Sequence, residues 1–236
     1  MGDVLLCGGV DATVVRGIME GFVMMRIVST AWESDPPRAS RPFSADRDGF
    51  VLGESAWMFV LEERERARAG ARGSMARSAA TVPPATPTTA CAWTRPGEEP
   101  ARAMALALEE VGTDRPTPSD YLAFHGTSTE LNDRVETRAV RLAFGSRAAR
   151  LPGSSIKSMI GHPQSACGAA GVDGDAPGDA RFLRFRRRST SSDADPECDL
   201  DYVANEARNV IRLSTRVCNS HRFRLKNSAL VISNES

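Results

Sequence analysis

Short apolar segments typical of β-strands alternate with longer amphipathic segments typical of helices, and this alternation limits the fold more than any other feature. The strand-like segments, the first two of which read as buried strands, are residues 4–7, 50–61, 121–124 and 229–232. The helix-like segments, the last of which is only a small-residue helix start, are residues 13–28, 62–72, 101–111, 133–144 and 168–171. Residues 203–212 are a further element. Alternation of this kind predicts an α/β protein.

The composition is that of a globular chain without a strongly charged partner. Its 236 residues, 41% of them hydrophobic, suffice for one large domain or two small ones. Thirty basic residues balance thirty acidic ones and no apolar run could span a bilayer, so we expect no nucleic-acid and no membrane partner. The first residues lack the basic and apolar regions of a signal peptide.

The cysteines indicate the compartment. Five of them are scattered without a CxxC pair, namely Cys7, Cys91, Cys167, Cys198 and Cys218. This spacing argues against a zinc site and against a disulfide framework, and it fits a reducing environment. We therefore expect a cytoplasmic protein without a bound metal.

Two segments break the alternation. Residues 74–100 contain five prolines and no usable period, and residues 173–192 run from Asp, Gly and Pro into an arginine cluster. Both are typical of flexible loops or linkers. For the second segment, a basic patch that binds phosphate is the alternative.

Two short motifs place a histidine beside glycine and small hydroxyl residues. They read FHGTST at residues 124–129 and SSIKSMIGH at residues 154–162. Taken alone, His125 reads as a hydrogen-bonded loop residue, Lys157 as a surface charge, and Glu136 as part of the polar face of a helix. The joint pattern of both motifs, with a glutamate between them, favours a shared site instead.

The two motifs resemble those of the β-ketoacyl-[acyl carrier protein] synthases, the KAS II-like condensing enzymes of the thiolase-like superfamily. Longer ordered matches to this family lie at residues 7–12, 40–54, 195–202 and 205–208. The resemblance covers most of the chain and implies an α/β thiolase-like fold that is present only in part. Residues 1–72 would be the end of the N-terminal half, and residues 73–236 the C-terminal half.

The resemblance also implies a reaction and partners. Family members condense malonyl-[acyl carrier protein] with an acyl thioester, with loss of carbon dioxide, in fatty-acid or polyketide synthesis. The substrates are carried on the phosphopantetheine of acyl carrier protein, so no cofactor is expected. The intact family implies a homodimer.

By resemblance, His125 and His162 face the nucleophile and donate hydrogen bonds to the malonyl thioester carbonyl, which a neutral imidazole can do. Lys157 lies near His125 and is oriented by Glu136. The remaining assigned residues are Thr127 and Thr129, which bind the phosphopantetheine arm, and Phe223, which gates the acyl pocket.

Two features depart from the family pattern. The family's nucleophile lies in a motif like Thr-Ala-Cys-Ser-Ser at a helix start; this sequence lacks that motif, so no cysteine is assigned as the nucleophile. Residues 219–227 stand where the family has a loop like Asn-Ser-Phe-Gly-Phe-Gly-Gly-x-Asn, and larger side chains replace its glycines. His221 reads as a substitution in a damaged loop rather than as a third catalytic histidine.

Two hypotheses about function therefore stay open. The chain is a β-ketoacyl synthase, or it is an inactive truncated or frameshifted remnant, or a partner subunit without its own nucleophile. Shifted readings of GC-rich codons for family strings reproduce parts of both irregular segments, which motivates the frameshift. We expect exposed apolar strand edges, and low solubility or partial disorder, unless a partner supplies the rest of the fold.

Overall fold

The computed structural model describes residues 3–70, 77–81, 96–111, 119–173, 195–203, 214–222 and 226–233. Its strands are β1 (Val4–Asp11), β2 (Ser55–Glu62), β3 (Arg77–Thr81), β4 (Tyr121–Ala123), β5 (Gly153–Ser154), β6 (Thr215–Arg222) and β7 (Lys226–Ser233). Its α-helices are α1 (Arg16–Met24), α2 (Arg64–Ala69), α4 (Glu98–Glu110), α5 (Glu130–Phe144), α6 (Lys157–Ile160) and α7 (Cys167–Asp173). Short 3₁₀ helices occupy Pro36–Arg38, Gly145–Arg150 and Gln164–Ala166.

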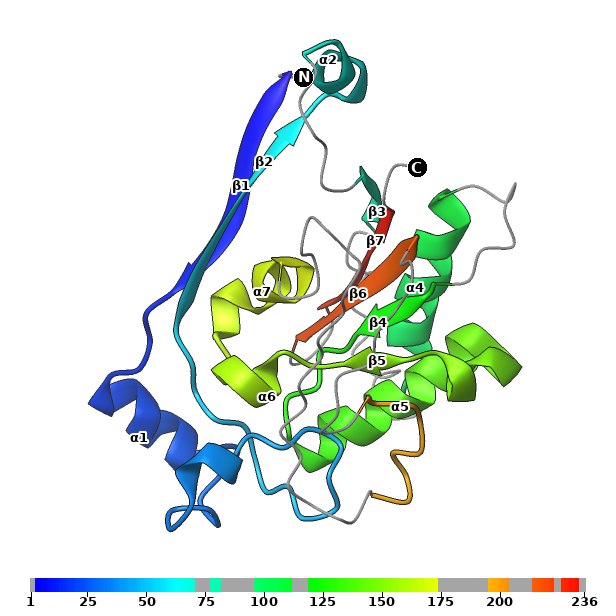
Figure 1. Cartoon of the computed structure of the whole chain (residues 1–236). Coiled ribbons are helices and arrows are strands. Elements are labelled where there is room, and N and C mark those ends of the chain that lie inside the picture. Colours follow the sequence, from blue (N-terminus) through cyan, green and yellow to red (C-terminus); the bar gives the residue numbers. More distant parts are fainter. Residues whose placement is uncertain are drawn as a thin grey trace.

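A mixed five-stranded sheet forms the centre of the molecule, with the strand order β3-β7-β6-β4-β5. Strand β4 runs parallel to both β5 and β6, whereas β7 is antiparallel to β6 and β3. Helices α4 and α5 cover one face of this sheet and α7 lies against the other (Figure 1). This arrangement of helices on both faces confirms the α/β prediction.

The period of two along β6 distributes its side chains between the two faces of the sheet. Val217 packs into the core formed with α4 and α5, and Asn219, on the same face, contacts Met104 of α4. Cys218 packs with Tyr121 and Val172 on the other face, towards α7. The same alternation decides which residues near the end of β6 reach the functional site described below.

Helix α5 buries one face, which is polar near its N-terminal end and apolar further along. Ala139 and Val140 pack in the apolar core, whereas Asp133, Glu136 and Thr137 are buried one or two turns nearer the N-terminus. Residues three and four apart lie on one side of a helix, so these five form a continuous stripe. The polar part of the stripe lies under the loop that carries His125.

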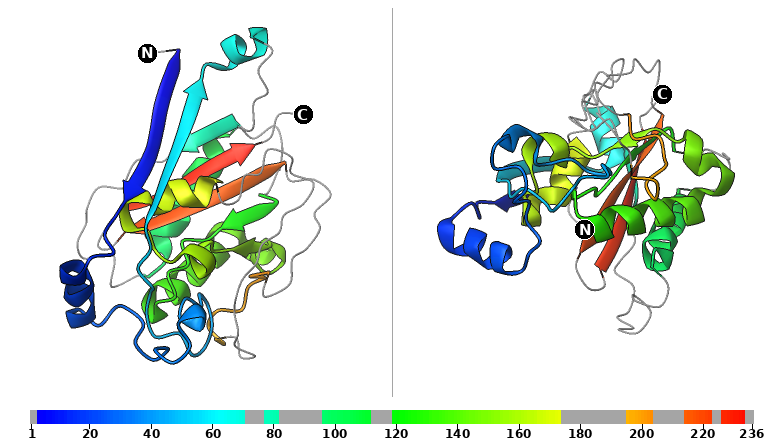
Figure 2. Two further views of the ribbon diagram at one scale, coloured as in Figure 1. Left: turned by 60° about the vertical axis from the view of Figure 1, so that its left-hand side comes forward. Right: turned by 90° about the horizontal axis from the view of Figure 1, so that it is seen from below.

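Strands β1 and β2 form a separate antiparallel ribbon, with α7 between it and the central sheet (Figure 2). One face of the ribbon packs on α7 and on the 3₁₀ helix at Gln164–Ala166. The outer face is exposed and apolar, with 46–68% exposure at Val4, Leu6, Val10, Met58 and Val60. The prediction that residues 4–7 and 50–61 are buried strands is therefore wrong, because nothing in the described part of the chain covers this face.

Several predicted boundaries also need correction. Helix α1 is shorter than residues 13–28 and buries none of its residues. Residues 77–81 form β3 and residues 98–100 begin α4, so part of the segment 74–100 is regular structure rather than a loop. Residues 82–95, 174–192 and 204–212 lie outside the described residues. No described helix is both long and apolar enough to cross a membrane.

We predict that the outer face of the ribbon drives self-association. Leu6 and Val60 are paired directly across the ribbon, so Leu6→Glu combined with Val60→Lys replaces two apolar groups by an opposite-charge pair. This variant should bind less of the dye ANS and sediment as a smaller species than the wild type. Leu142→Lys, which changes an exposed leucine on α5, is the control and should alter neither measurement. Equal behaviour of all three proteins would contradict the prediction.

Candidate functional site

Three parallel strands bring the candidate site residues to one edge of the sheet. His125 follows the end of β4, Lys157 follows the end of β5, and His221 lies near the end of β6. Because β5, β4 and β6 are adjacent and parallel, their carboxyl ends meet at the same edge, where open α/β sheets bind ligands. Residues that are almost a hundred positions apart in the sequence thus become neighbours.

The backbone of His125 is held from two sides. The carboxylate of Glu136 accepts the backbone N–H groups of His125 and Gly126, both at 2.8 Å. The ammonium of Lys157 donates to the carbonyl oxygen of His125 at 2.6 Å. From the sequence, we expected Glu136 to orient Lys157. In the structure both side chains contact the backbone of His125, Glu136 at its N–H group and Lys157 at its carbonyl oxygen.

Gly126 permits the sharp turn that follows His125. Its φ is +38°, and a β-carbon there would lie 2.6 Å from the β-carbon of Ser155 and 3.0 Å from the Phe43 ring. The hydroxyl of Ser155 donates to the carbonyl of Gly126 at 2.8 Å, which ties the first histidine motif to the second.

His162 is fixed by the segment that precedes β2. Its backbone N–H donates to the carbonyl of Val51 at 2.7 Å, and its own carbonyl accepts from Gly53 at 3.2 Å. Its ring meets that of Phe50 edge-on, with 5.4 Å between centroids. Residues 50–54 therefore run beside the site instead of starting the strand, which begins at Ser55.

The rings of His125 and His162 face each other in a dry environment. Their centroids are 5.4 Å apart and their planes are nearly perpendicular, at 85°. Burial, with the nearby Lys157 charge, lowers the pKa of His125 well below its usual value and that of His162 to about 3. The Nδ1 atoms of both rings are buried without a hydrogen-bond partner among the described residues. Two neutral imidazoles at neutral pH are the result.

His221 joins this pair, although its sequence context favoured a substitution in a damaged loop over a catalytic role. Its ring centroid lies 5.6 Å from that of His125. The chain has three histidines, so all of them meet in one cluster. The idea that His221 lies in a damaged loop is wrong, because Asn219–Arg222 belong to β6 and pair with Lys226–Ala229 of β7. The period of a strand, with Asn219 two residues earlier, was the signal that could have placed it.

Glu136 is fully buried, and its carboxylate also accepts from the side chain of Asn219 at 3.3 Å. Burial raises the pKa of Glu136, while the backbone donors of Gly126 and His125 and the charge of Lys157 act in the opposite direction. Lys157 is itself only 3% exposed. The site thus contains a buried cation and a buried carboxylate that share one peptide segment.

A second buried carboxylate, that of Asp133, is hydrogen-bonded to the loop that follows β4. Asp133 accepts the backbone N–H groups of Phe43 at 2.8 Å and Thr127 at 3.1 Å, and it lies 3.3 Å from the guanidinium of Arg47. Arg47 also donates to Asp195 at 2.8 Å. Burial raises the pKa of Asp133 to about 6 despite Arg47. This network joins three distant segments around α5.

The remaining predicted residues are placed as follows. The hydroxyls of Thr127 and Thr129 are 2.9 Å apart, and Thr127 is buried whereas Thr129 is partly exposed. Their contact with phosphopantetheine stays a prediction. Phe223, the predicted acyl gate, lies outside the described residues.

The cysteines that the structure describes are all free thiols. Burial raises the pKa of Cys198 to about 11, and Cys218 faces α7 on the side of β6 opposite His221. Cys7 lies in the middle of β1, which corrects its predicted position at the end of a buried strand. Cys91 lies outside the described residues. Among those residues, no group of three or more His, Cys, Asp or Glu is arranged to hold a metal ion.

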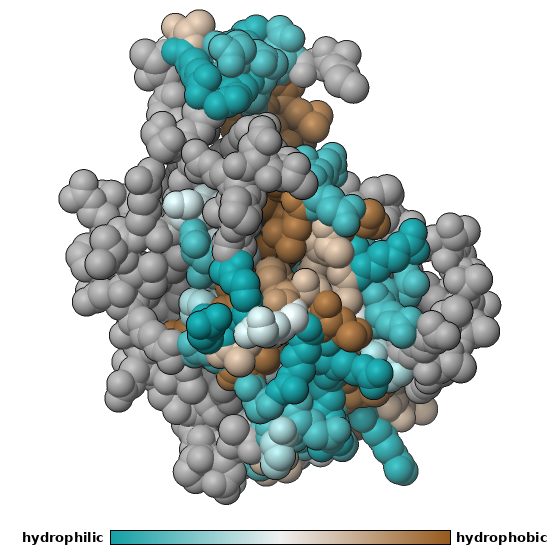
Figure 3. Space-filling model, turned by 90° about the vertical axis from the view of Figure 1, so that its right-hand side faces the viewer, coloured by the Kyte–Doolittle hydropathy of each residue, from teal (hydrophilic) through white to brown (hydrophobic). Residues whose placement is uncertain are grey.

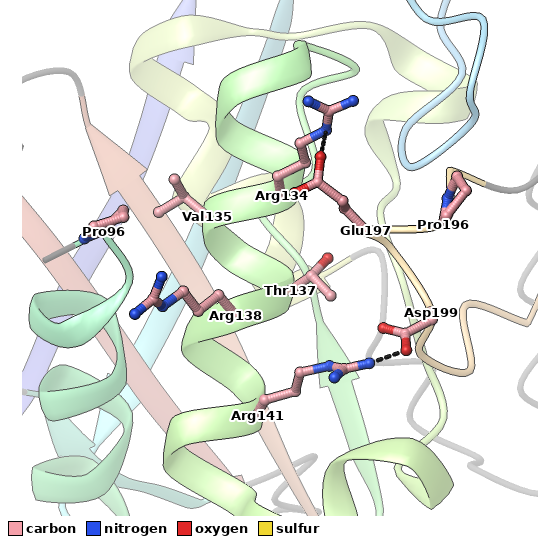
Figure 4. A pocket seen from close by; sticks show the side chains of 9 residues that line it. All are labelled: Pro96, Arg134, Val135, Thr137, Arg138, Arg141, Pro196, Glu197 and Asp199. Carbon is pink, nitrogen blue, oxygen red and sulfur yellow. Dashed lines mark ion pairs between the residues drawn. The ribbon is translucent and has the colours of Figure 1, made fainter.

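A pocket of about 350 Å³ lies elsewhere, along the outer side of α5 (Figure 4). Its arginines are largely neutralised, since Arg134 pairs with Glu197 at 2.9 Å and Arg141 pairs with Asp199. Seen from the right-hand side of Figure 1, a strip of apolar side chains has hydrophilic ones to its right and below it (Figure 3). None of the three histidines lines this pocket, so we do not assign it to the site.

Comparisons with known proteins agree with the motifs. A family model described as the N-terminal domain of beta-ketoacyl synthase matches residues 1–67, and one described as the C-terminal domain matches residues 86–173. The second match begins at residue 86, inside the irregular segment at residues 74–100. The division of the chain at residues 72 and 73 stays a prediction.

Individual relatives give the same picture. The chain is 41% identical over 221 residues to the tetracenomycin polyketide synthase ketoacyl synthase alpha subunit of Streptomyces glaucescens, covering 87% of this chain and 48% of that protein. It is 39% identical over 214 residues to 3-oxoacyl-[acyl-carrier-protein] synthase 2 of Synechocystis, covering 88% and 49%. A solved type II polyketide ketosynthase, in complex with its acyl carrier protein and bound to a hexaketide, matches with a TM-score of 0.86 and 26% identity over 99% of this chain and 56% of that one. The chain thus spans about half the length of these proteins, and its thiolase-like fold covers part of theirs.

We predict that Glu136→Gln destabilises the chain more than a matched change on the same helix. A glutamine offers one acceptor oxygen and turns an N–H₂ group towards a backbone N–H, so one buried donor loses its partner. The cost should be about 1–3 kcal/mol in the free energy of unfolding, measured in urea. Glu130→Gln, which changes an exposed residue paired with Arg134, should cost less than about 0.5 kcal/mol. Equal costs for the two variants would show that Glu136 does not hold the loop.

Proposed function

The chain belongs to the β-ketoacyl synthase family, and on that premise we propose that its histidine site decarboxylates a malonyl thioester. The observation that supports this most directly is the pair of buried, neutral imidazoles of His125 and His162, 5.4 Å apart. In fatty-acid and polyketide synthesis, this step generates the carbon nucleophile for condensation. Decarboxylation is one step of the condensation that members of the family carry out.

The chemistry needs donors that stabilise a developing negative charge. When the bond between the malonyl α-carbon and its carboxylate breaks, carbon dioxide leaves and the electron pair passes into the thioester as an enolate. Neutral imidazole N–H groups from His125 and His162 would donate to the enolate oxygen. A preformed pair of donors in a water-poor site stabilises such a charge strongly, because it need not reorganise. Lys157 adds positive charge and fixes the His125 backbone.

The second half of a condensation needs a thiolate that holds the acyl chain. The sequence holds no family nucleophile motif, so none of its cysteines is assigned as that thiol. Condensation by this protein would therefore take its thiol from another segment or subunit. The same observation favours the second candidate function, a partner subunit that does not carry the nucleophile, or an inactive remnant.

The partners follow from the proposed reaction. The solved relative bound to its acyl carrier protein supports an acyl carrier protein as the donor of the malonyl group. The phosphopantetheine arm would pass Thr127 and Thr129, and no further cofactor takes part in the step. A homodimer and a cytoplasmic location complete the proposal, the second supported by the scattered cysteines.

We predict that the chain releases carbon dioxide from malonyl-[acyl carrier protein], and that His125→Ala and His162→Ala each slow this release. Loss of one donor to a developing oxyanion lowers a rate by about 10²–10³-fold. Radiolabelled carbon dioxide measures the step, and urea unfolding checks that each variant is folded. Met159→Ala, an exposed change on α6, is the control and should keep the wild-type rate.

Acyl transfer supplies the complementary measurement. After incubation with an acyl thioester, mass spectrometry should find no acyl group on any of the five cysteines. An adduct would assign the chain its own nucleophile. If the variant that lacks both His125 and His162 still releases carbon dioxide at the wild-type rate, the proposed function is contradicted.

A further inference from the structure

His221 occupies a position where its strand directs it into the site. Asn219 and His221 are two residues apart on β6, so they share the face that looks towards α5 and His125. Asn219 contacts Glu136 on this face, and the ring of His221 lies 5.6 Å from that of His125. Ser220, between them, points the other way and lies 4.0 Å from the sulfur of Cys167. The pattern makes His221 part of the site by the register of the strand.

His221 differs from the other two histidines in its access to water. His125 and His162 are only 4% and 7% exposed, whereas His221 is partly exposed. Its Nε2 atom is nevertheless buried and has no hydrogen-bond partner among the described residues. Within the described part of the chain, the ring therefore has one buried polar atom without a partner, while part of the residue is exposed.

The groups around His221 keep it neutral when the site is empty. Burial, and then the charge of Lys157 on α6, lower its pKa to about 4. His125 is the titratable ring that packs against it, and burial also lowers the pKa of His125 well below its usual value. The residue opposite His221 on β7 is Asn227, which does not titrate. The buried carboxylate of Glu136 on α5 accepts the backbone N–H of His125.

We propose that His221 is the proton donor of the site: it takes up a proton when a malonyl thioester binds and delivers that proton to the enolate carbon. This assignment rests on the proposed decarboxylation and adds a catalytic residue to it. The product is an acetyl thioester, and the step needs no other reactant.

The proposed step balances in protons and in charge. A malonyl carboxylate bound beside the ring would raise the pKa of His221 above about 4, by about 3 if the two groups lie about 4 Å apart in a site of intermediate polarity. Loss of neutral carbon dioxide leaves the negative charge in the site, moved from the carboxylate to the enolate, so the imidazolium keeps its counter-charge. The proton then passes from nitrogen to the α-carbon, a C–H bond forms, and His221 returns to its neutral form.

Proton uptake tests the assignment independently of turnover. Binding of malonyl-coenzyme A, measured by calorimetry at pH 6.5 in buffers of different ionisation enthalpy, should take up about half a proton or more per site. Because the chain has only three imidazoles, NMR can follow each one, and the pKa of His221 should rise by about 3 on binding. In His221→Gln, which keeps a polar side chain but cannot titrate, the uptake should vanish.

Turnover supplies the second measurement. His221→Gln and His221→Phe should form acetyl-coenzyme A at least about 10²-fold more slowly than the wild type, as expected for loss of a general acid. Ser220→Ala, on the opposite face of β6, is the matched control and should leave both uptake and rate unchanged. An unchanged His221 titration on addition of malonyl-coenzyme A, or unchanged uptake in His221→Gln, would overturn the assignment. A wild type that takes up the proton but releases no carbon dioxide would instead overturn the proposed function.

Discussion

The site depends on the two hydrogen bonds that the Glu136 carboxylate accepts from the backbone N–H groups of His125 and Gly126. A buried carboxylate is costly unless donors surround it, and here three donors do so, the third from Asn219 on β6. The contact links α5 to the end of β4 and to β6 at once. Because Lys157 holds the same peptide through its carbonyl, the position of the His125 ring follows from the backbone rather than from its own side-chain contacts.

The order of the sheet explains why the other groups arrive at the same place. Strands β5, β4 and β6 lie side by side and run parallel, so the segments that follow them meet at one edge of the sheet. His162 reaches this edge differently, through backbone hydrogen bonds to Val51 and Gly53. The segment before β2 thereby joins the ribbon to the site. The exposed outer face of that ribbon is an apolar surface that the described residues leave uncovered.

Much of this arrangement follows from the sequence, and the exceptions have physical causes. The helix at residues 133–144 and the strand before His125 were predicted from local patterns, whereas the burial of the polar stripe formed by Asp133, Glu136 and Thr137 was not. The burial of β1 and β2 was predicted wrongly because apolar composition shows what a strand prefers to contact, not whether a neighbour is there. The segment at residues 219–227 was read as a loop because its family counterpart is glycine-rich. With larger side chains, residues 219–222 are strand, and only that register turns His221 towards His125.

Amide hydrogen exchange of the 236-residue chain tests most directly whether the site is preorganised. We expect the amides of His125 and Gly126, which lie in an irregular segment outside any strand or helix, to exchange as slowly as those of buried β4. Their protection would come from the Glu136 carboxylate, and Glu136→Gln should remove it for at least one of the two. Exchange of both amides at the rate of an unprotected peptide would contradict the account, because the two histidines would then have no fixed position to share.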